Sequence, residues 1–214
     1  NNGSNSALPN MYSWKYDRLF DYTPLEEDKA PRGIIGVPRV LNMYENYPFW
    51  FTFFTKLGFR VILSPMSSKE LYEKGIDTIS SDTACYPAKL VHGHIKALVE
   101  QGEKWIFYPC INYEQNEDPL SQNHYNCPIV VSYSENIKNN MESIATENVK
   151  YIQPFMAFTS EETVAYKMIK VCAAEWNISP KEVKAAVKEA WAEQMAAKED
   201  IRRHRGSLAT AVPR

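Results

Sequence analysis

Three of the four cysteines of this chain adjoin a proline, and each lies where one predicted element gives way to the next. These segments are Cys85-Tyr86-Pro87, Pro109-Cys110 and Cys127-Pro128. A side chain at such a junction can face a cleft instead of a core. The fourth cysteine, Cys172, falls on an apolar stripe at helical spacing, which predicts packing in the core.

Cys85 is predicted at the start of a helix. Pro87 suits a first turn, where its missing N–H is no loss, and apolar residues then recur at helical spacing. The positive end of a helix biases a sulfur toward thiolate, the form that binds metal or attacks an electrophile. The alternative is that Cys85 is a small buried apolar residue, which is the commonest state of a free cysteine.

The predicted sheet brings two of these cysteines to one edge. Cys110 ends a predicted strand at 105–110, and Cys85 begins the preceding helix, so both are expected at the carboxyl edge where open α/β sheets bind ligands. Cys127 precedes a predicted strand at 128–133, and simple winding places it at the opposite edge. The long polar loop 111–126 would have to bring it round, and loops of this length are often functional.

Polar and aromatic side chains are predicted to surround the cysteines. This group consists of Tyr86, Lys89, His92, Tyr113, Glu114, His124 and Asn126. Lys89, His92 and Lys96 fall on the less apolar face of the Cys85 helix, which predicts exposure to solvent or contact with an anionic cofactor. His94 falls near Leu90 and Leu98, and we expect it to be partly buried.

The spacing of the cysteines leaves several chemistries open. Structural zinc sites usually contain cysteine pairs two to four residues apart, and this chain has none. Three widely spaced thiolates fit an iron–sulfur cluster with one open iron. They fit equally a zinc site completed by His124 or His92, or a catalytic cysteine with histidine as its base. Unconnected structural cysteines are the remaining interpretation.

Alternating patterns predict a Rossmann-like, doubly wound α/β fold, with a mainly parallel sheet and helices on both faces. Strands are predicted at 33–41, 59–65, 105–110, 128–133 and 151–158, and helices at 46–58, 67–75, 85–102 and 134–144. Capping boxes at 159–162 and 179–182 predict a C-terminal helical pair. We therefore expect a tag remnant and extended aromatic lead-in at 1–32, a Rossmann-like domain at 33–158, and helices at 159–206 that lead into a further domain.

Composition narrows the class of protein. The 24 basic and 26 acidic residues give a net charge of -2, so no basic footprint for nucleic acid is present. No apolar run has the length of a membrane span, and four cysteines are too few for a secreted disulfide scaffold. No glycine-rich phosphate loop follows any predicted strand. These features predict a cytoplasmic protein with reduced thiols and no membrane partner.

Several motifs together resemble a known family. They are Gly36-Val-Pro-Arg-Val-Leu-Asn-Met-Tyr-Glu45, Tyr47-Pro-Phe-Trp-Phe-Thr-Phe-Phe54, Cys85-Tyr-Pro-Ala-Lys-Leu-Val-His-Gly-His94, Phe107-Tyr-Pro-Cys110 and Asn123-His-Tyr-Asn-Cys-Pro128. Over residues 11–158 the chain resembles the uncharacterised domain attached to CoA-substrate-specific enzyme activases, a relative of the 2-hydroxyacyl-CoA dehydratase subunits.

The resemblance implies a function. It implies a [4Fe-4S] cluster held by Cys85, Cys110 and Cys127, and an electron-transfer or acceptor role beside ATPase activase domains of the same or an associated chain. A 2-hydroxyacyl-CoA dehydratase is a further implied partner. A non-catalytic docking domain with structural cysteines is the alternative, and part of a radical dehydratase is a second one. As an isolated fragment the chain is not expected to be catalytic.

Overall fold

The structure is a computed structural model that describes residues 10–211, with side chains described as far as His204. The beginning of the predicted tag remnant, residues 1–9, lies outside the described residues. Within the described part every helix is either too short or too polar to cross a lipid bilayer.

A parallel sheet forms the centre of the molecule. Its strands are β1 (Ile34–Val37), β2 (Arg60–Leu63), β3 (Trp105–Phe107) and β5 (Lys150–Ile152), in the order β2-β1-β3-β5. Beyond them, β4 (Cys110–Glu114) and β6 (Phe155–Phe158) form a second parallel pair. Pro109 and Pro154 interrupt the strands because proline has no N–H to donate to a sheet. The predicted mainly parallel α/β fold is confirmed.

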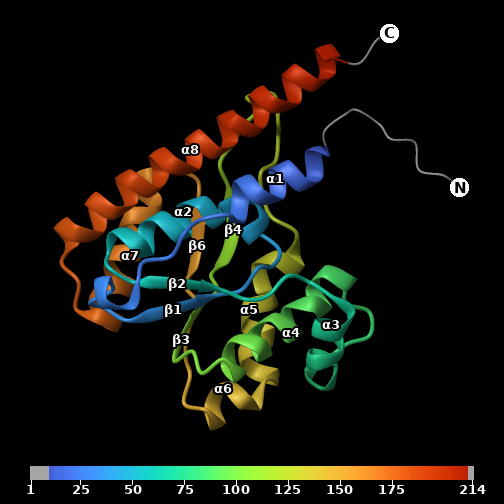
Figure 1. Ribbon diagram of the computed structural model, residues 1–214, viewed down its shortest axis with the longest axis vertical. Coiled ribbons are helices and arrows are strands. Elements are labelled where there is room, and N and C mark those ends of the chain that lie inside the picture. Colours follow the sequence, from blue (N-terminus) through green and yellow to red (C-terminus); the bar gives the residue numbers. More distant parts are fainter. Residues whose placement is uncertain (1–9, 212–214) are drawn as a thin grey trace, which may run out of the picture.

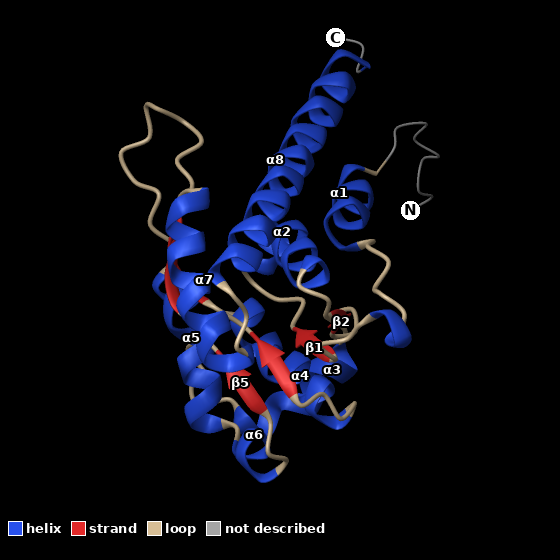
Figure 2. Cartoon of the chain, turned by 90° about the vertical axis from the view of Figure 1, so that its left-hand side faces the viewer, coloured by secondary structure: helices blue, strands red, loops and turns tan. Residues whose placement is uncertain are grey.

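Helices cover both faces of the sheet (Figures 1 and 2). On one side lie α1 (Met11–Phe20), α2 (Met43–Lys56), α7 (Glu161–Trp176) and α8 (Pro180–Ala211). On the other lie α3 (Lys69–Gly75), α4 (Tyr86–Glu100), α5 (Pro128–Asn140) and α6 (Glu142–Thr146). Two short 3₁₀ turns occur at Glu27–Lys29 and Ile76–Thr78. The predicted C-terminal helical pair, α7 and α8, is confirmed.

The aromatic helix α2 is the centre of the hydrophobic core. Phe49, Trp50, Phe53 and Phe54 are fully buried. Trp50 packs against Phe107 of β3, with ring centroids 4.6 Å apart, so α2 is fixed to the sheet. The same core includes buried residues of α7 and α8. The position of the loop before α2 is therefore set by a large apolar contact.

The predicted strand at 128–133 is wrong, because this segment is the first half of α5. The run Ile-Val-Val favours a strand by its β-branched side chains, but Pro128 occupies the first turn of the helix, where its fixed φ is favourable. Cys110 also differs from expectation, since it begins β4 instead of ending a strand. Both changes alter where the cysteines lie.

Three helix starts also differ from expectation. The lead-in, expected to be extended, contains α1, a ten-residue helix whose N-cap Asn10 accepts two backbone N–H groups. Helix α2 begins before Asn46, so that Pro48 lies inside it. Helix α3, predicted from 67, begins at Lys69 with Ser68 as its N-cap, and the hydroxyl of Ser67 contacts His94.

Candidate functional site

Cys85 and Cys127 occupy equivalent places on two helices in contact. Cys85 is the N-cap of α4 and Cys127 is the N-cap of α5, and each is followed by a proline in the first turn. Both side chains are exposed. Each sulfur therefore lies at the positive end of a helix macrodipole. Because Cys127 precedes a helix and not a strand, the reason for placing it at the opposite edge of the sheet no longer holds.

Cys110 has a different environment from the other two cysteines. It is fully buried at the start of β4, within hydrogen-bond reach of the Ser134 side chain and the Glu135 backbone on α5. Burial raises the pKa of the Cys110 thiol, which outweighs the lowering effect of these hydrogen bonds. This packing therefore favours the neutral thiol.

The three cysteines all lie around α5 without forming a closed set of ligands. Cys127 caps that helix, Cys110 packs against its middle, and Cys85 lies close enough to its Tyr133 to contribute to the raised pKa of the phenol, behind the larger effect of burial. Within the described side chains, no group of three His, Cys, Asp or Glu residues is placed to hold a metal ion. Cys85 and Cys127 fit a thiolate-bound group in kind, but Cys110 does not reach such a group in this packing.

His92 is buried and not exposed as its sequence position predicts. Its Nδ1 lies 2.7 Å from the hydroxyl of Thr78 and its Nε2 lies 3.1 Å from the hydroxyl of Tyr133. The Thr78 hydroxyl donates to the Gly75 carbonyl, so it must accept from His92, which assigns the proton to Nδ1. Tyr133 then donates to Nε2. Both nitrogens are occupied, so His92 is not available as a metal ligand in this arrangement.

Burial lowers the pKa of His92 to about 4, against a smaller opposing effect of Asp77. His94 is also buried, as expected, between the hydroxyls of Ser64 at 2.7 Å and Ser67 at 3.0 Å. Burial likewise lowers its pKa to about 4, and the charge of Arg39 adds to the effect. Both imidazoles are therefore neutral at pH 7.

Two other predicted neighbours of Cys85 lie near the molecular surface. Tyr86 is exposed and packs against the ring of Tyr72, with centroids 5.3 Å apart. Lys89 donates from Nζ to the backbone carbonyl of Asp82 at 2.7 Å. These contacts fix the loop before α4 and leave the Cys85 side chain open to solvent.

Glu114 lies at the centre of a polar cluster at the end of β4. Its carboxylate accepts hydrogen bonds from Asn46 Nδ2 at 3.1 and 3.2 Å and from Asn126 Nδ2 at 3.0 Å. Burial raises the pKa of Glu114, while the two amides act in the opposite direction. Asn126 precedes Cys127 directly, so this cluster fixes the start of α5. Asn46 was not among the predicted residues, since its role depends on a strand far away in the sequence.

The loop after β4 closes on itself and is held to α8 by Lys198, which contacts Gln115 and Glu117. The backbone N–H of Glu114 donates to the carbonyl of His124 at 3.0 Å, and Nδ1 of His124 lies 2.7 Å from the carbonyl oxygen of Glu114. Tyr113 pairs with Tyr125 in an isolated antiparallel bridge. The structure thus brings Tyr113, Glu114, His124 and Asn126 together, but places them around the start of α5 and not around a common metal position.

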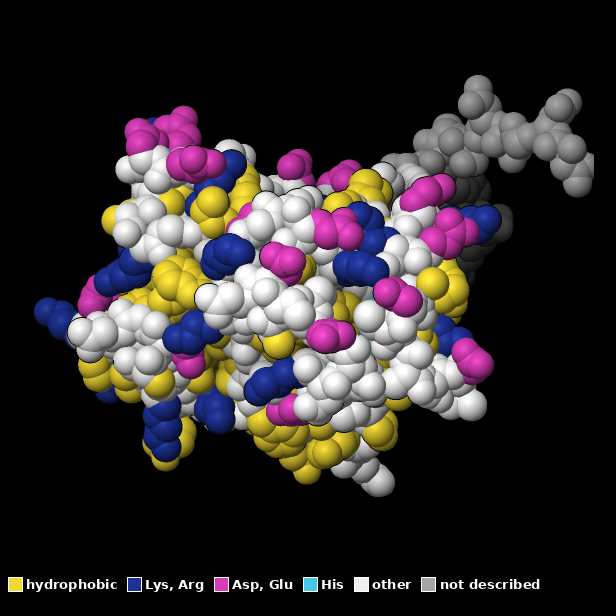
Figure 3. All heavy atoms as spheres, turned by 90° about the horizontal axis from the view of Figure 1, so that it is seen from below, with side chains coloured by type: hydrophobic (Ala, Val, Ile, Leu, Met, Phe, Trp, Pro, Cys, Tyr) yellow, Lys and Arg dark blue, Asp and Glu magenta, His cyan; other side chains and the backbone are white. Residues whose placement is uncertain are grey.

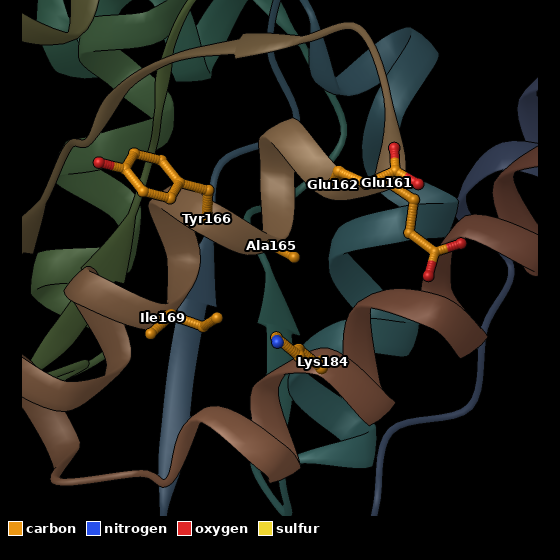
Figure 4. A pocket seen from close by; sticks show the side chains of 6 residues that line it. All are labelled: Glu161, Glu162, Ala165, Tyr166, Ile169 and Lys184. Carbon is orange, nitrogen blue, oxygen red and sulfur yellow. The ribbon is translucent and has the colours of Figure 1, made fainter.

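One surface hollow lies away from the predicted site residues. A hollow between α7 and α8 is lined by Glu161, Glu162, Ala165, Tyr166, Ile169 and Lys184 (Figure 4). None of the predicted site residues lines it. On the face shown in Figure 3, basic and acidic side chains are interspersed, in keeping with the small net charge.

Comparison with protein families gives one match. The profile of the family described as the CoA enzyme activase uncharacterised domain matches residues 34–212. Comparison with curated proteins and with solved structures gives no significant match. The matched range begins at β1 and includes all three proline-flanked cysteines.

Proposed function

The chain belongs to the family of CoA enzyme activase uncharacterised domains, and we propose that it is an iron–sulfur-binding electron-transfer or acceptor module of an ATP-dependent acyl-CoA dehydratase activation system. In this proposal Cys85, Cys110 and Cys127 hold the cluster. ATPase activase domains and a 2-hydroxyacyl-CoA dehydratase are the proposed partners.

One observation carries the proposal: two exposed cysteines cap neighbouring helices, α4 and α5, in the same way. Each thiol must lose its proton to bind iron, and a helix N-terminus lowers the free energy of the thiolate. A cluster bound there would supply one-electron chemistry. The role of this chain would be to fix the two sulfurs, through the His92–Tyr133 contact between α4 and α5 and through the Glu114–Asn126 contact at the start of α5.

Cys110 is the weakest part of the proposed ligand set. Its thiol is buried against α5, so it reaches a cluster only if α5 moves relative to β4. The proposal therefore includes a small displacement of α5 on cluster binding. Increased hydrogen exchange of residues 127–135 during reconstitution would report that displacement.

Anaerobic reconstitution with iron and sulfide tests the proposal, by metal analysis and by the visible spectrum. The single variants Cys85→Ala, Cys110→Ala and Cys127→Ala are compared with Cys172→Ala, which removes a buried thiol of α7. We expect stoichiometric iron in the parent chain and in Cys172→Ala, with clear loss in Cys85→Ala and Cys127→Ala. The proposal is wrong if no iron is retained, or if iron is retained equally when all three proline-flanked cysteines are alanine.

The burial of Cys110 favours a second candidate function, a docking domain whose cysteines are structural. A buried thiol with a raised pKa is typical of a packing residue. Under this function, Cys110→Ala lowers stability, while Cys85→Ala and Cys127→Ala leave both stability and binding to the ATPase domains unchanged. Pull-down with those domains, measured beside the iron analysis, separates the two functions.

A further inference from the structure

Arg39, in the loop after β1, is a half-buried cation without an acidic partner. Its Nη1 donates to the hydroxyl of Tyr16 at 2.5 Å, and its guanidinium lies over the rings of Tyr16 and Phe20, 5.4 and 5.1 Å from their centroids. No ion pair among the described side chains includes it, whereas Arg18 and Arg32 each pair with carboxylates. Its Nε is buried and has no hydrogen-bond partner.

Asn42 and Asn46, which follow Arg39 in the chain, also carry unpartnered buried groups. Asn42, the N-cap of α2, is 5% exposed, and neither its Nδ2 nor its Oδ1 has a partner. Asn46 follows one helical turn later, is 1% exposed, and has an unpartnered Oδ1. Each such group costs about 1–3 kcal/mol when buried unpaired. Native proteins keep few of them, so several within residues 39–46 need an explanation.

The segment 39–46 follows β1, at the edge where this type of sheet binds ligands. In the order β2-β1-β3-β5, the chain leaves β1 for α2 on one face and leaves β3 and β4 for α5 on the other. The crevice outside the carboxyl ends of β1 and β3 is therefore the topological switch point of the sheet. Arg39 and Asn42 belong to the loop that leaves β1 at that point.

The loop is held in place before any ligand arrives. The backbone N–H of Arg39 donates to Ser64 Oγ at 2.8 Å, at the end of β2. Leu41 has a φ of 41°, a left-handed conformation that is unusual for a branched side chain and persists only where the surroundings impose it. The charge of Arg39 also contributes to the lowered pKa of His94, behind the larger effect of burial.

We propose that Arg39 and Asn42 form a binding site for an anionic group, a phosphate or a carboxylate, at the switch point between β1 and β3. The guanidinium Nε–H and the Asn42 amide would donate to the anion, and the positive end of α2 would add to the attraction. The oxygen of Asn46 would accept from a neighbouring hydroxyl or amine of the same ligand. This site uses none of the three proline-flanked cysteines and does not depend on cluster binding.

The Arg39 Nε–H resonance in ¹⁵N-labelled protein tests the site directly. Inorganic phosphate and acetate are titrated separately, each against chloride of equal ionic strength. We expect a saturable shift of this resonance with at least one anion. Arg39→Gln should lower the affinity by about tenfold or more, because it removes a charged donor. The control Arg32→Gln, at an arginine paired with Glu182, should leave the affinity unchanged.

The two probes also identify the source of the anion. A response to phosphate alone assigns a phosphoryl ligand, and a response to acetate alone assigns a carboxylate. Asn42→Ala is the second variant, with folding checked by circular dichroism, and it should weaken binding as well. The site is excluded if neither anion shifts the Arg39 resonance beyond the chloride reference, or if Arg32→Gln weakens binding as much as Arg39→Gln.

Discussion

At the scale of single residues, His92 couples the two helices that carry the exposed cysteines. It extends from α4 to Tyr133 of α5 on one side and to Thr78 on the other. An imidazole fixed by two neutral hydroxyls inside the protein is stable only while it carries no charge. The positions of Cys85 and Cys127 relative to each other therefore depend on the protonation state of His92.

Acidification is expected to weaken this contact. The pKa of His92 is about 4 in the folded chain, against an ordinary value of 6.5, so the unfolded chain binds its proton first as pH falls. The stabilisation is complete above pH 6.5 and is lost between pH 6.5 and 4, by at most about 3 kcal/mol. Urea unfolding at pH 7 and pH 5 measures the loss, and His92→Gln should reduce it. Equal losses in the parent chain and the variant would contradict this account.

Only some of these residue roles could be predicted from sequence. The helix start at Cys85 follows from Pro87 and the apolar spacing after it, and both are local signals. The burial of His92 could not be predicted in this way, because Thr78 and Tyr133, which satisfy its nitrogens, come from other elements. The partnership of Asn46 with Glu114 joins positions 68 residues apart and has no local signal.

At the scale of elements, α5 takes the place of the strand predicted at 128–133, and this changes where Cys127 lies. Residues 128–133 contain three β-branched apolar side chains, which favour a strand: Ile129, Val130 and Val131. The N-terminal signal, Cys127 followed by Pro128, was as strong as the one at Cys85 and Pro87. The pair Cys127 and Pro128 thus indicates a helix N-terminus of the same kind, which does not place Cys127 at the opposite edge of the sheet.

Proline substitutions distinguish the helix from a strand at α5. The N–H of Val131 donates to the Cys127 carbonyl at 3.1 Å, so Val131→Pro removes a helical hydrogen bond and should cost about 3 kcal/mol or more. Pro128 has no such bond to lose, and Pro128→Ala should change stability by less than about 1 kcal/mol. Chemical denaturation of both variants provides the comparison. A small effect of Val131→Pro would indicate that this segment is not helical.

At the scale of the whole molecule, α8 completes the packing of α2. The capping box at 179–182 predicts the start of this helix, and Ser179 Oγ accepts the N–H of Glu182 there. One face of the helix packs in the core. Val183, Ala186, Val187 and Ala190 are fully buried. Small side chains allow close approach of two helices, but alanine spacing alone does not identify the partner helix.

Gln194 of α8 provides the most specific link between the two helices. It is fully buried, its Oε1 accepts the N–H of Phe49 at 3.2 Å, and its Nε2 donates to the carbonyl of Glu45 at 2.7 Å. Pro48 lies between these two residues, and a proline inside a helix disturbs the hydrogen bonding of the turn before it. One amide of α8 thus satisfies a donor and an acceptor of α2 beside that proline.

Removing this amide is expected to destabilise the whole chain. Gln194→Leu keeps the approximate volume but removes both hydrogen bonds to α2, at a cost of about 1–3 kcal/mol. Because the core is continuous from α2 through α8, unfolding should remain a single transition at lower urea concentration. Gln101→Leu, at the exposed end of α4, is the control and should have little effect. If Gln194→Leu instead produced a separate early transition, α8 would be a detachable unit, and the position of the Arg39 loop would not depend on it.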